Sequence, residues 1–248
     1  WVAKRIVAML PAHKVYVEPF AGGAQVLFAK EPSEIEVLND MDPEIAAAFR
    51  FVRDVTDDQM AALKRFEWTG RREYFEKLLK SDIPKDPVAR FHHFIYLNRF
   101  SYFSRRKTFQ PPDEGVEGGI LKRLPAGHER MKGVKVYNED YAAVLERHDG
   151  PDTVFFLDPP FTGYKQDVGE GEWDEVRFFK LIKKLKGKFV CTYGTRGDPA
   201  LLTGFKVLRA RVTMGHPDGP RPGTLLFITN FDTKTKAKAE SEPIDKAI

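Results

Sequence analysis

The string Asp158-Pro159-Pro160-Phe161 joins an acid, two prolines and an aromatic ring directly after the apolar run of residues 153–157. A carboxylate at Asp158 and the backbone carbonyl of Pro159, held by the fixed proline φ, can accept both N–H groups of an exocyclic amine. Such acceptors draw the nitrogen toward tetrahedral geometry and free a lone pair that the ring otherwise delocalises. A ring such as Phe161 can stack on the base that carries the amine. The string predicts amine activation on a nucleobase, and the alternative is a loop stiffened by prolines.

A second candidate site is the turn Glu18-Pro19-Phe20-Ala21-Gly22-Gly23, which lies between a short β-type run and an apolar helical stretch. Glycines at such a turn let a ligand approach the backbone at the carboxyl edge of a sheet. Asp40 ends the next predicted strand eighteen residues after Gly22, the spacing at which an acid binds ribose hydroxyls. No complete GxGxxG is present, which suits a ligand that has a ribose and no pyrophosphate, such as S-adenosylmethionine. The alternatives are a plain tight turn and a helix cap at Asn39-Asp40.

Six separated motifs follow one another along the chain: residues 16–24, Leu38-Asn39-Asp40, Tyr96-Leu97-Asn98-Arg99, Asp140-Tyr141, Asp158-Pro159-Pro160-Phe161, and a closing strand with Asn230. In this order they resemble the Dam-like family of DNA adenine methyltransferases, class alpha amino-methyltransferases in which the glycine motif comes first. The resemblance covers most of the chain. It implies S-adenosylmethionine as the cofactor and double-stranded DNA as the partner. It also implies direct methyl transfer to N6 of an adenine that has been flipped out of the duplex.

The resemblance assigns roles to individual residues. Residues 20–23 would cradle the methionine part of the cofactor, and Asp40 would hold its ribose. Asp140 would accept a hydrogen bond from the cofactor's adenine amino group, with Tyr141 beside it. By itself, Asp140 predicts an N-cap for a helix that starts at Tyr141. The candidate cofactor-binding residues are Glu18, Pro19, Phe20, Ala21, Gly22, Gly23, Asn39, Asp40, Asp140 and Tyr141, and the candidate catalytic residues are Asp158, Pro159, Pro160 and Phe161.

The sequence departs from the family pattern in three places. The family carries a Gly-Gly-Lys element upstream of the first helix, whereas this chain begins at Trp1 without an initiating Met, so we expect an interior part of a longer gene product. Phe161 replaces the commoner Tyr, which keeps the stacking surface and removes a hydroxyl. The central insertion does not match the hairpin that reads GATC in well-known members, so no target sequence is predicted.

The insertion is the predicted DNA surface. Residues 99–135 hold nine Lys and Arg side chains against four Asp and Glu, a larger excess than the +4 of the whole chain. Basic groups contact phosphates and can read guanine edges in the major groove, although a charged run is often only a solvated face. The candidate DNA-binding residues are Asn98, Arg99, Arg105, Arg106, Lys107, Lys122 and Arg123.

The elements that must position these motifs alternate between strand and helix at both ends of the chain. We predict strands over residues 15–17, 35–38, 134–137, 153–157 and 188–193, and a terminal hairpin from residues 205–213 and 224–231. A long helix over residues 172–186 is predicted to stop at Gly187 in the C′ position.

This pattern predicts an α/β, Rossmann-like methyltransferase fold: a mostly parallel sheet with a C-terminal antiparallel hairpin and an inserted, mainly helical target-recognition lobe. The predicted catalytic domain comprises residues 1–50 and 134–232, and the inserted lobe residues 51–133. In that lobe, helical segments are expected to start at Asp57, Arg71 and Asp86. Residues 233–248 are expected to form a flexible tail.

Composition limits the alternatives. With 42% hydrophobic residues among 248, the chain can bury one substantial core. Its single cysteine, Cys191, suits a reducing compartment, no apolar run reaches membrane-spanning length, and no His or Cys spacing predicts a metal site. We therefore expect a cytoplasmic protein that does not bind a membrane, and the sequence leaves its oligomeric state open.

Three rival functions remain at this point. They are methylation of cytosine N4, methylation of RNA or of a protein amide, and a degenerate module that binds DNA without turnover. Asp158 and the basic insertion favour DNA over the second, because an Asn often leads the motif in RNA and protein enzymes. Restriction companion, phage modification and regulatory methylation all fit the sequence.

Overall fold

The computed structural model describes residues 2–102, 106–111, 119–161, 173–214 and 221–233. The chain divides into two compact units, here called the sheet unit, residues 1–43 with Val134 onward, and the helical unit, residues 44–133. The first segment of the predicted catalytic domain ended at residue 50, whereas the first segment of the sheet unit ends at residue 43. The division comes earlier because helix α3 (Pro43–Asp54) packs Ala48 and Phe51 into the core of the helical unit.

The sheet unit is built on seven strands in the order β3-β2-β1-β4-β5-β7-β6. The first five strands are parallel, and β7 pairs antiparallel with both β5 and β6. Their bounds are β1 Val15–Glu18, β2 Ile35–Asn39, β3 Lys135–Tyr137, β4 Thr153–Leu157, β5 Lys188–Tyr193, β6 Lys206–Met214 and β7 Arg221–Thr229. The predicted mostly parallel sheet with a terminal antiparallel hairpin is confirmed.

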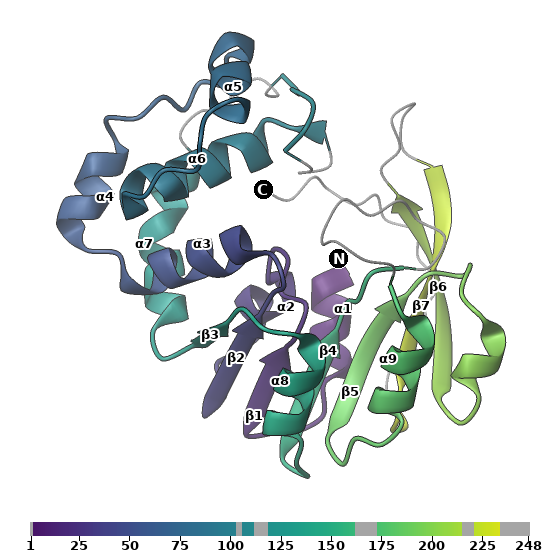
Figure 1. Cartoon of the computed structure of the whole chain (residues 1–248). Helices are drawn as coiled ribbons and strands as arrows, with labels where there is room; N and C mark the ends of the chain where they lie inside the picture. The colour runs from purple at the N-terminus through teal and green to yellow at the C-terminus, as the bar shows by residue number, and fades with distance from the viewer. Residues whose placement is uncertain (1, 103–105, 112–118, 162–172, 215–220, 234–248) are drawn as a thin grey trace. The chain divides into compact units, whose positions relative to one another are not determined.

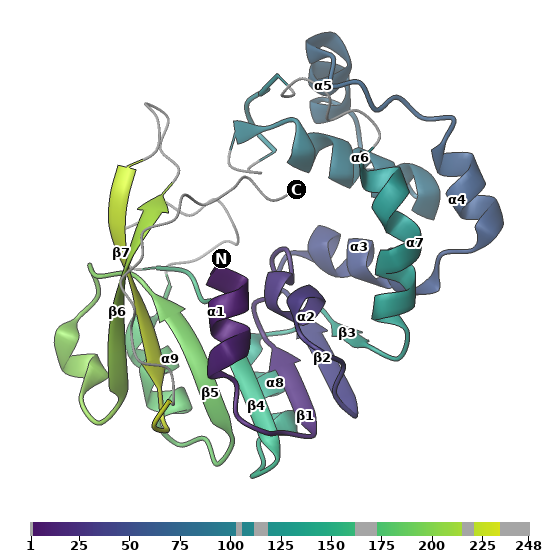
Figure 2. The same cartoon turned by 180° about the vertical axis from the view of Figure 1, so that it is seen from behind.

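Helices cover both faces of this sheet. In Figure 1, α8 (Tyr141–His148) and α9 (Glu175–Ile182) lie in front of the strands, and in Figure 2, α1 (Val2–Met9) and α2 (Gln25–Ala29) lie in front of the opposite face. Every residue of β4 is buried, as expected of a parallel strand covered on both sides. Side chains alternate between the two faces, so Val17 joins the core beneath α8 and α9 while its neighbour Glu18 points to the other face.

The helical unit follows the local signals of its sequence. Thr56 forms a capping box with Gln59 at the start of α4 (Asp57–Leu63). Asp86 caps α6 (Pro87–Arg99), accepting from the amide of Ala89 at 2.8 Å with a proline at the first helical position. The remaining helices are α5 (Arg72–Leu79) and α7 (Gly119–Met131). The predicted helical starts near residues 57, 71 and 86 are thus confirmed.

Some elements differ from the sequence prediction. Helices α1 and α7 were not predicted from the sequence. Helix α7 carries Pro125 inside it, where a proline removes a helical N–H donor. Helix α9 covers Glu175–Ile182 instead of residues 172–186, so Gly187 is not its C′ residue. Glycine at position 187 is instead explained by close packing, because a Cβ there would come within 2.9 Å of the Phe155 ring and 3.0 Å of the Thr153 carbonyl.

Candidate active site

The carboxyl ends of β1 and β4 lie side by side at the centre of the sheet. From β1 the strand order runs to β2 and β3 on one side and to β4 and β5 on the other. In open α/β sheets this reversal leaves a crevice at the carboxyl edge, where ligands bind. The turn that starts at Glu18 leaves β1 at this edge, and Asp158 directly follows β4. The fold therefore brings together two motifs that are 140 residues apart in the sequence.

The glycine turn adopts a conformation that favours glycine at one position. Gly22 has a φ of +47°, which strains any residue with a Cβ, and nothing lies within 4 Å of where that Cβ would be. Its amide donates to Oδ2 of Asp40 at 2.9 Å, while Oδ1 accepts from the amide of Asp42 at 2.9 Å. Asp40 thus holds the turn and the start of the next segment at once, so its two predicted roles are compatible.

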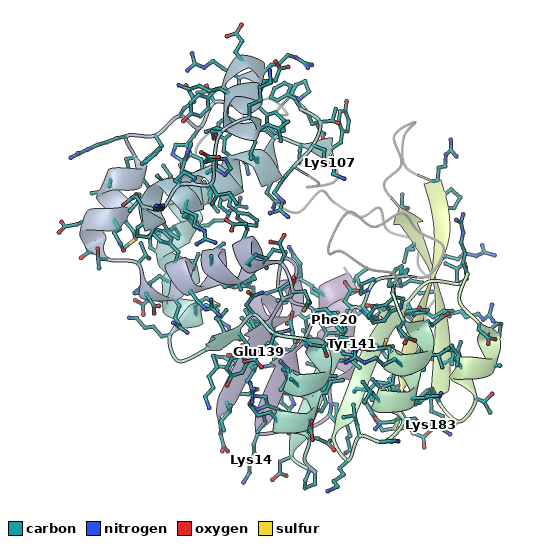
Figure 3. The ribbon with its side chains drawn as sticks, in the orientation of Figure 1. Lys14, Phe20, Lys107, Glu139, Tyr141 and Lys183 are labelled. Atoms are coloured by element: carbon teal, nitrogen blue, oxygen red, sulfur yellow. The ribbon has the colours of Figure 1, made fainter. Side chains whose placement is uncertain are left out.

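An aromatic cluster stands beside this turn. Phe20 lies 5.1 Å from the ring of Tyr141 and 5.9 Å from the rings of Trp173 and Phe178, measured between centroids. Figure 3 shows Phe20 and Tyr141 together at one end of the sheet. Phe20 is half-buried, so part of its ring remains available to a ligand. Trp173 was not anticipated, because it comes from a segment far along the chain and only the fold brings it to Phe20.

Asp140 has two kinds of partner in the structure. Its Oδ1 caps α8 by accepting from the amide of Ala142 at 2.9 Å, which confirms the predicted N-cap. Arg177, from α9, donates to Oδ1 at 2.9 Å and to Oδ2 at 3.1 Å, and its guanidinium lies 5.1 Å above the Tyr141 ring. Arg177 was not predicted as a site residue, since no local pattern links it to a residue 37 positions away.

Asn39 is fully buried, and backbone groups engage its side chain. Its amide donates to the carbonyls of Pro19 at 2.9 Å and Glu139 at 3.1 Å, and its Oδ1 accepts from the Glu139 amide at 3.0 Å. The backbone carbonyl of Asn39 accepts from Ala21 at 2.8 Å. This placement ties the ends of three strands together, so Asn39 positions the loops that follow these strands.

Glu18 is also fully buried, and its carboxyl accepts from the Tyr16 hydroxyl at 2.7 Å and the Leu27 amide at 2.8 Å through Oε1. Its Oε2 has no hydrogen-bond partner among the described residues. Loss of water on burial, reinforced by the nearby negative charge of Asp158, raises the pKa of Glu18 to about 8. Near neutral pH this carboxyl therefore carries a proton for much of the time.

Asp158 presents an exposed face but is surrounded by protein on its other sides, and this desolvation raises its pKa. The hydroxyl of Thr192 donates to its Oδ1, which opposes part of that rise. Pro159 is buried and Pro160 is half-buried. The ring of Phe161 lies 5.5 Å from that of Tyr193 and is also half-buried, so it retains surface for stacking.

The sheet unit fits S-adenosylmethionine on several independent features. The space above Gly22, which a Cβ would occupy, leaves room for a ligand against the backbone. Asp40 offers a carboxylate at the end of β2, where a ribose is bound in related sheets. Phe20 and Tyr141 supply aromatic surface next to Asp140. These residues can hold the sugar, the base and the methionine part of that cofactor.

The predicted DNA-binding residues lie in the helical unit. Asn98 and Arg99 end α6, and Lys122 and Arg123 are exposed on α7, whereas Arg105 lies outside the described residues. The guanidinium of Arg106 lies 5.1 Å above the Phe94 ring, and Lys107 is exposed, as Figure 3 shows.

Arg99 and Arg123 converge on one point of this unit. A Cβ at Gly119 would lie 3.5 Å from Nη2 of Arg123 and 3.9 Å from Nη2 of Arg99. Burial, and after it the charge of Arg123, lowers the pKa of Arg99. Two neighbouring guanidiniums of this kind suit an anionic group such as a phosphate.

Other functional classes find less support in the structure. Among the described residues, no group of three or more His, Cys, Asp or Glu side chains could hold a metal ion. Cys191 is fully buried, and burial followed by the charge of Asp158 raises the pKa of its thiol well above the usual value, which disfavours a thiolate nucleophile. No helix in the described parts of the chain has the length and apolar character that crossing a bilayer requires.

The strand order and the edge motifs define a Rossmann-like methyltransferase fold. In comparison with known proteins, residues 2–110 match the model of the D12 class N6 adenine-specific DNA methyltransferases. The resemblance predicted from the sequence motifs is therefore confirmed.

Individual relatives agree with this family match. The chain is 26% identical over 205 residues to type II methyltransferase M.MjaIII of Methanocaldococcus jannaschii, covering 69% of this chain and 70% of the relative. It is 23% identical over 211 residues to type II methyltransferase M.CviBI of Paramecium bursaria Chlorella virus NC1A, covering 77% of each chain. DNA adenine methylase of Escherichia coli is 25% identical over 162 residues, which cover 61% of this chain and 58% of that protein. Together the comparisons support adenine-specific DNA methylation.

Proposed function

We propose that this chain transfers a methyl group from S-adenosylmethionine to N6 of adenine in double-stranded DNA. The observation that carries the proposal is Asp158 at the carboxyl end of β4, one strand away from the glycine turn that ends β1. The turn offers a place for the cofactor, and Asp158-Pro159-Pro160-Phe161 offers acceptors and a stacking ring for the base. The family match names N6 of adenine as the target, and no comparison favours cytosine N4.

The chemistry follows from the groups at this edge. The adenine amine is a poor nucleophile because the ring delocalises its lone pair. The Asp158 carboxylate and the Pro159 carbonyl accept its two N–H groups, which holds the nitrogen in a reactive geometry. S-adenosylmethionine, when bound, supplies an electrophilic methyl group on a sulfonium. The amine nitrogen forms the new bond to carbon as the carbon–sulfur bond breaks, and Asp158, whose raised pKa favours protonation, takes up one amine proton and passes it to water.

A base that is paired in a duplex cannot reach such a pocket, so the target adenine must be flipped out of the helix. Phe161 then stacks on its exposed face and compensates part of the stacking that the base loses. The basic residues of the helical unit supply phosphate contacts, with Arg99 and Arg123 as the pair best placed to share one anion.

The test is transfer of labelled methyl groups to unmethylated duplex DNA, followed by digestion to nucleosides. We expect label on N6-methyladenine with the wild-type chain and a loss of label with Asp158→Ala. Asp152→Ala is the matched control, because Asp152 is an exposed acid just before the opposite end of the same strand. Label on N4-methylcytosine would replace the proposed target. No label, with a version extended at its N-terminus also silent and no cofactor binding by calorimetry, would leave a DNA-binding module.

A further inference from the structure

Thr192 is a polar residue in a strand that is otherwise apolar after its first residue. Strand β5 reads Lys-Phe-Val-Cys-Thr-Tyr, and Thr192 is only 2% exposed. Strands β4 and β5 are parallel, with Leu157 paired to Cys191. The next position along both strands places Asp158 opposite Thr192. A hydroxyl is therefore buried where the candidate catalytic acid leaves the sheet.

The hydroxyl of Thr192 is directed at that acid. Its Oγ1 donates to Oδ1 of Asp158, and it also lies 3.4 Å from the carbonyl of Leu157. A hydroxyl has one proton to donate, and the shorter of these two contacts is the one to the carboxylate. The contact satisfies the buried hydroxyl of Thr192, and at the same time it holds one oxygen of Asp158.

We propose that Thr192 is a positioning residue for the methyl transfer, because its hydroxyl fixes the rotamer of the Asp158 carboxyl and engages Oδ1. Oδ2 is then left to accept from the target amine. The proposal rests on the function proposed above and adds a residue to it. Thr192 does not touch the base. Its hydroxyl sets the direction from which the Asp158 carboxyl approaches the base.

The surroundings of Asp158 explain why such a donor is useful. Glu18 on β1 is close enough for the charge of Asp158 to raise its pKa, and burial raises the pKa of Asp158 itself. On β5, the thiol of Cys191 is also affected by Asp158 and carries no positive charge. Among these neighbours, Thr192 is the group whose hydrogen bond lowers the pKa of Asp158. Removing the hydroxyl should therefore loosen the carboxyl and raise its pKa further.

Three variants separate positioning from structural support. Thr192→Val keeps the shape and removes the hydroxyl, and Thr192→Ser keeps the hydroxyl. Thr153→Val is the matched control, since Thr153 is a buried threonine at the other end of β4 that donates to the His148 carbonyl at 2.7 Å. Thermal unfolding and calorimetric binding of S-adenosylmethionine establish that each variant is folded and binds the cofactor.

We expect Thr192→Val to lower kcat by about tenfold or more, the effect of one hydrogen bond to a charged group, with little change in cofactor affinity. The acidic limb of its pH–rate profile should move to higher pH, because Asp158 would then be protonated at a higher pH. Thr192→Ser should restore most of the rate, and Thr153→Val should leave the limb in place. Wild-type kcat and an unmoved limb in Thr192→Val would overturn the proposal.

A second readout does not depend on turnover. The pKa of Asp158 is followed by ¹³C NMR of labelled aspartate carboxyls, assigned with Asp158→Asn. A higher pKa in Thr192→Val than in Thr192→Ser supports the proposal, and equal values overturn it. If the wild-type chain makes no methyladenine, the proposed function fails, while this comparison still decides whether the Thr192 hydroxyl lowers the pKa of Asp158.

Discussion

Four of the carboxyl groups at the carboxyl edge of the sheet form two pairs that differ in their hydrogen bonds. Asp40 and Asp140 lie beside the expected cofactor position, and each accepts hydrogen bonds from backbone amides. Asp140 also receives both donor groups of Arg177. Glu18 and Asp158 lie at the ends of the two central strands, and the described residues donate to only one oxygen of each. One oxygen of Glu18 has no partner among the described residues, and the pKa of both groups is raised.

The difference shows how one sheet edge can serve two purposes. Carboxylates that are already held by backbone donors are fixed in place, which suits binding a ribose and a base through their N–H and O–H groups. A carboxyl oxygen that has no donor can still accept a hydrogen bond, and at Asp158 a substrate amine can supply it. We infer that the edge divides into a binding side and a reacting side.

The largest expected effect on stability concerns Glu18, on the reacting side. It is a change with pH in the free energy of unfolding. The pKa of Glu18 is about 8 in the folded chain, against an ordinary value of 4.5 for a glutamate side chain. Between these values the folded state holds a proton that the unfolded chain has lost, so Glu18 costs stability progressively as pH rises from 4.5 to 8. Glu18→Gln stays neutral and keeps an acceptor for Tyr16 and Leu27.

We therefore expect the free energy of unfolding of Glu18→Gln to exceed that of wild type by a margin that grows by roughly 3–5 kcal/mol between pH 5 and pH 9. Urea unfolding at pH 5, 7 and 9 measures this margin. Glu34→Gln, at an exposed position in the same unit, controls for the substitution itself. If the difference in free energy of unfolding between Glu18→Gln and wild type is constant across this range, Glu18 is ionised at neutral pH. Glu18 would then not differ from Asp40 and Asp140 in the way proposed.

The smallest expected effect tests the binding side. Arg177 and Asp140 are 48% and 43% exposed, and exposed ion pairs contribute at most about 1 kcal/mol to stability. Arg177→Met should therefore change the melting temperature by only a few degrees. Thermal unfolding checks this, and Lys180→Met, an exposed cation on the same helix, is the control. A large loss of stability would mean that Asp140 depends on Arg177 more than on its backbone donor.

Much of the site could be predicted from the sequence because its determinants are local. The glycine turn, the acid at residue 40 and the string from Asp158 to Phe161 each combine a strand end with residues of fixed conformational or chemical preference. The N-cap at Asp140 is local in the same sense. The alternation of strands and helices was sufficient to predict the parallel sheet and its antiparallel end.

What could not be predicted comes from contacts between distant segments. Thr192 donates a hydrogen bond to Asp158, 34 positions away in the sequence, and Arg177 donates to Asp140, 37 positions away. No repeating pattern in the sequence links the two residues of either pair. The burial of Asn39 was likewise invisible, and the structure shows its amide engaged by backbone carbonyls instead of exposed to a ligand. One signal could have identified Thr192. It is a threonine in an apolar strand, at the position that comes opposite Asp158 when β4 and β5 pair as parallel neighbours.

The most direct test of the divided edge is the single-turnover rate of methyl transfer at saturating S-adenosylmethionine, measured for Asp158→Asn beside the cofactor Kd of the same variant. We predict a rate lower by about 100- to 1,000-fold, as for loss of one preorganised group, with a Kd within about twofold of wild type. Asp40→Asn should show the opposite pattern, a Kd raised about tenfold. An Asp158→Asn enzyme that transfers at the wild-type rate, or that fails only because it no longer binds the cofactor, would contradict the assignment of Asp158 to the reacting side.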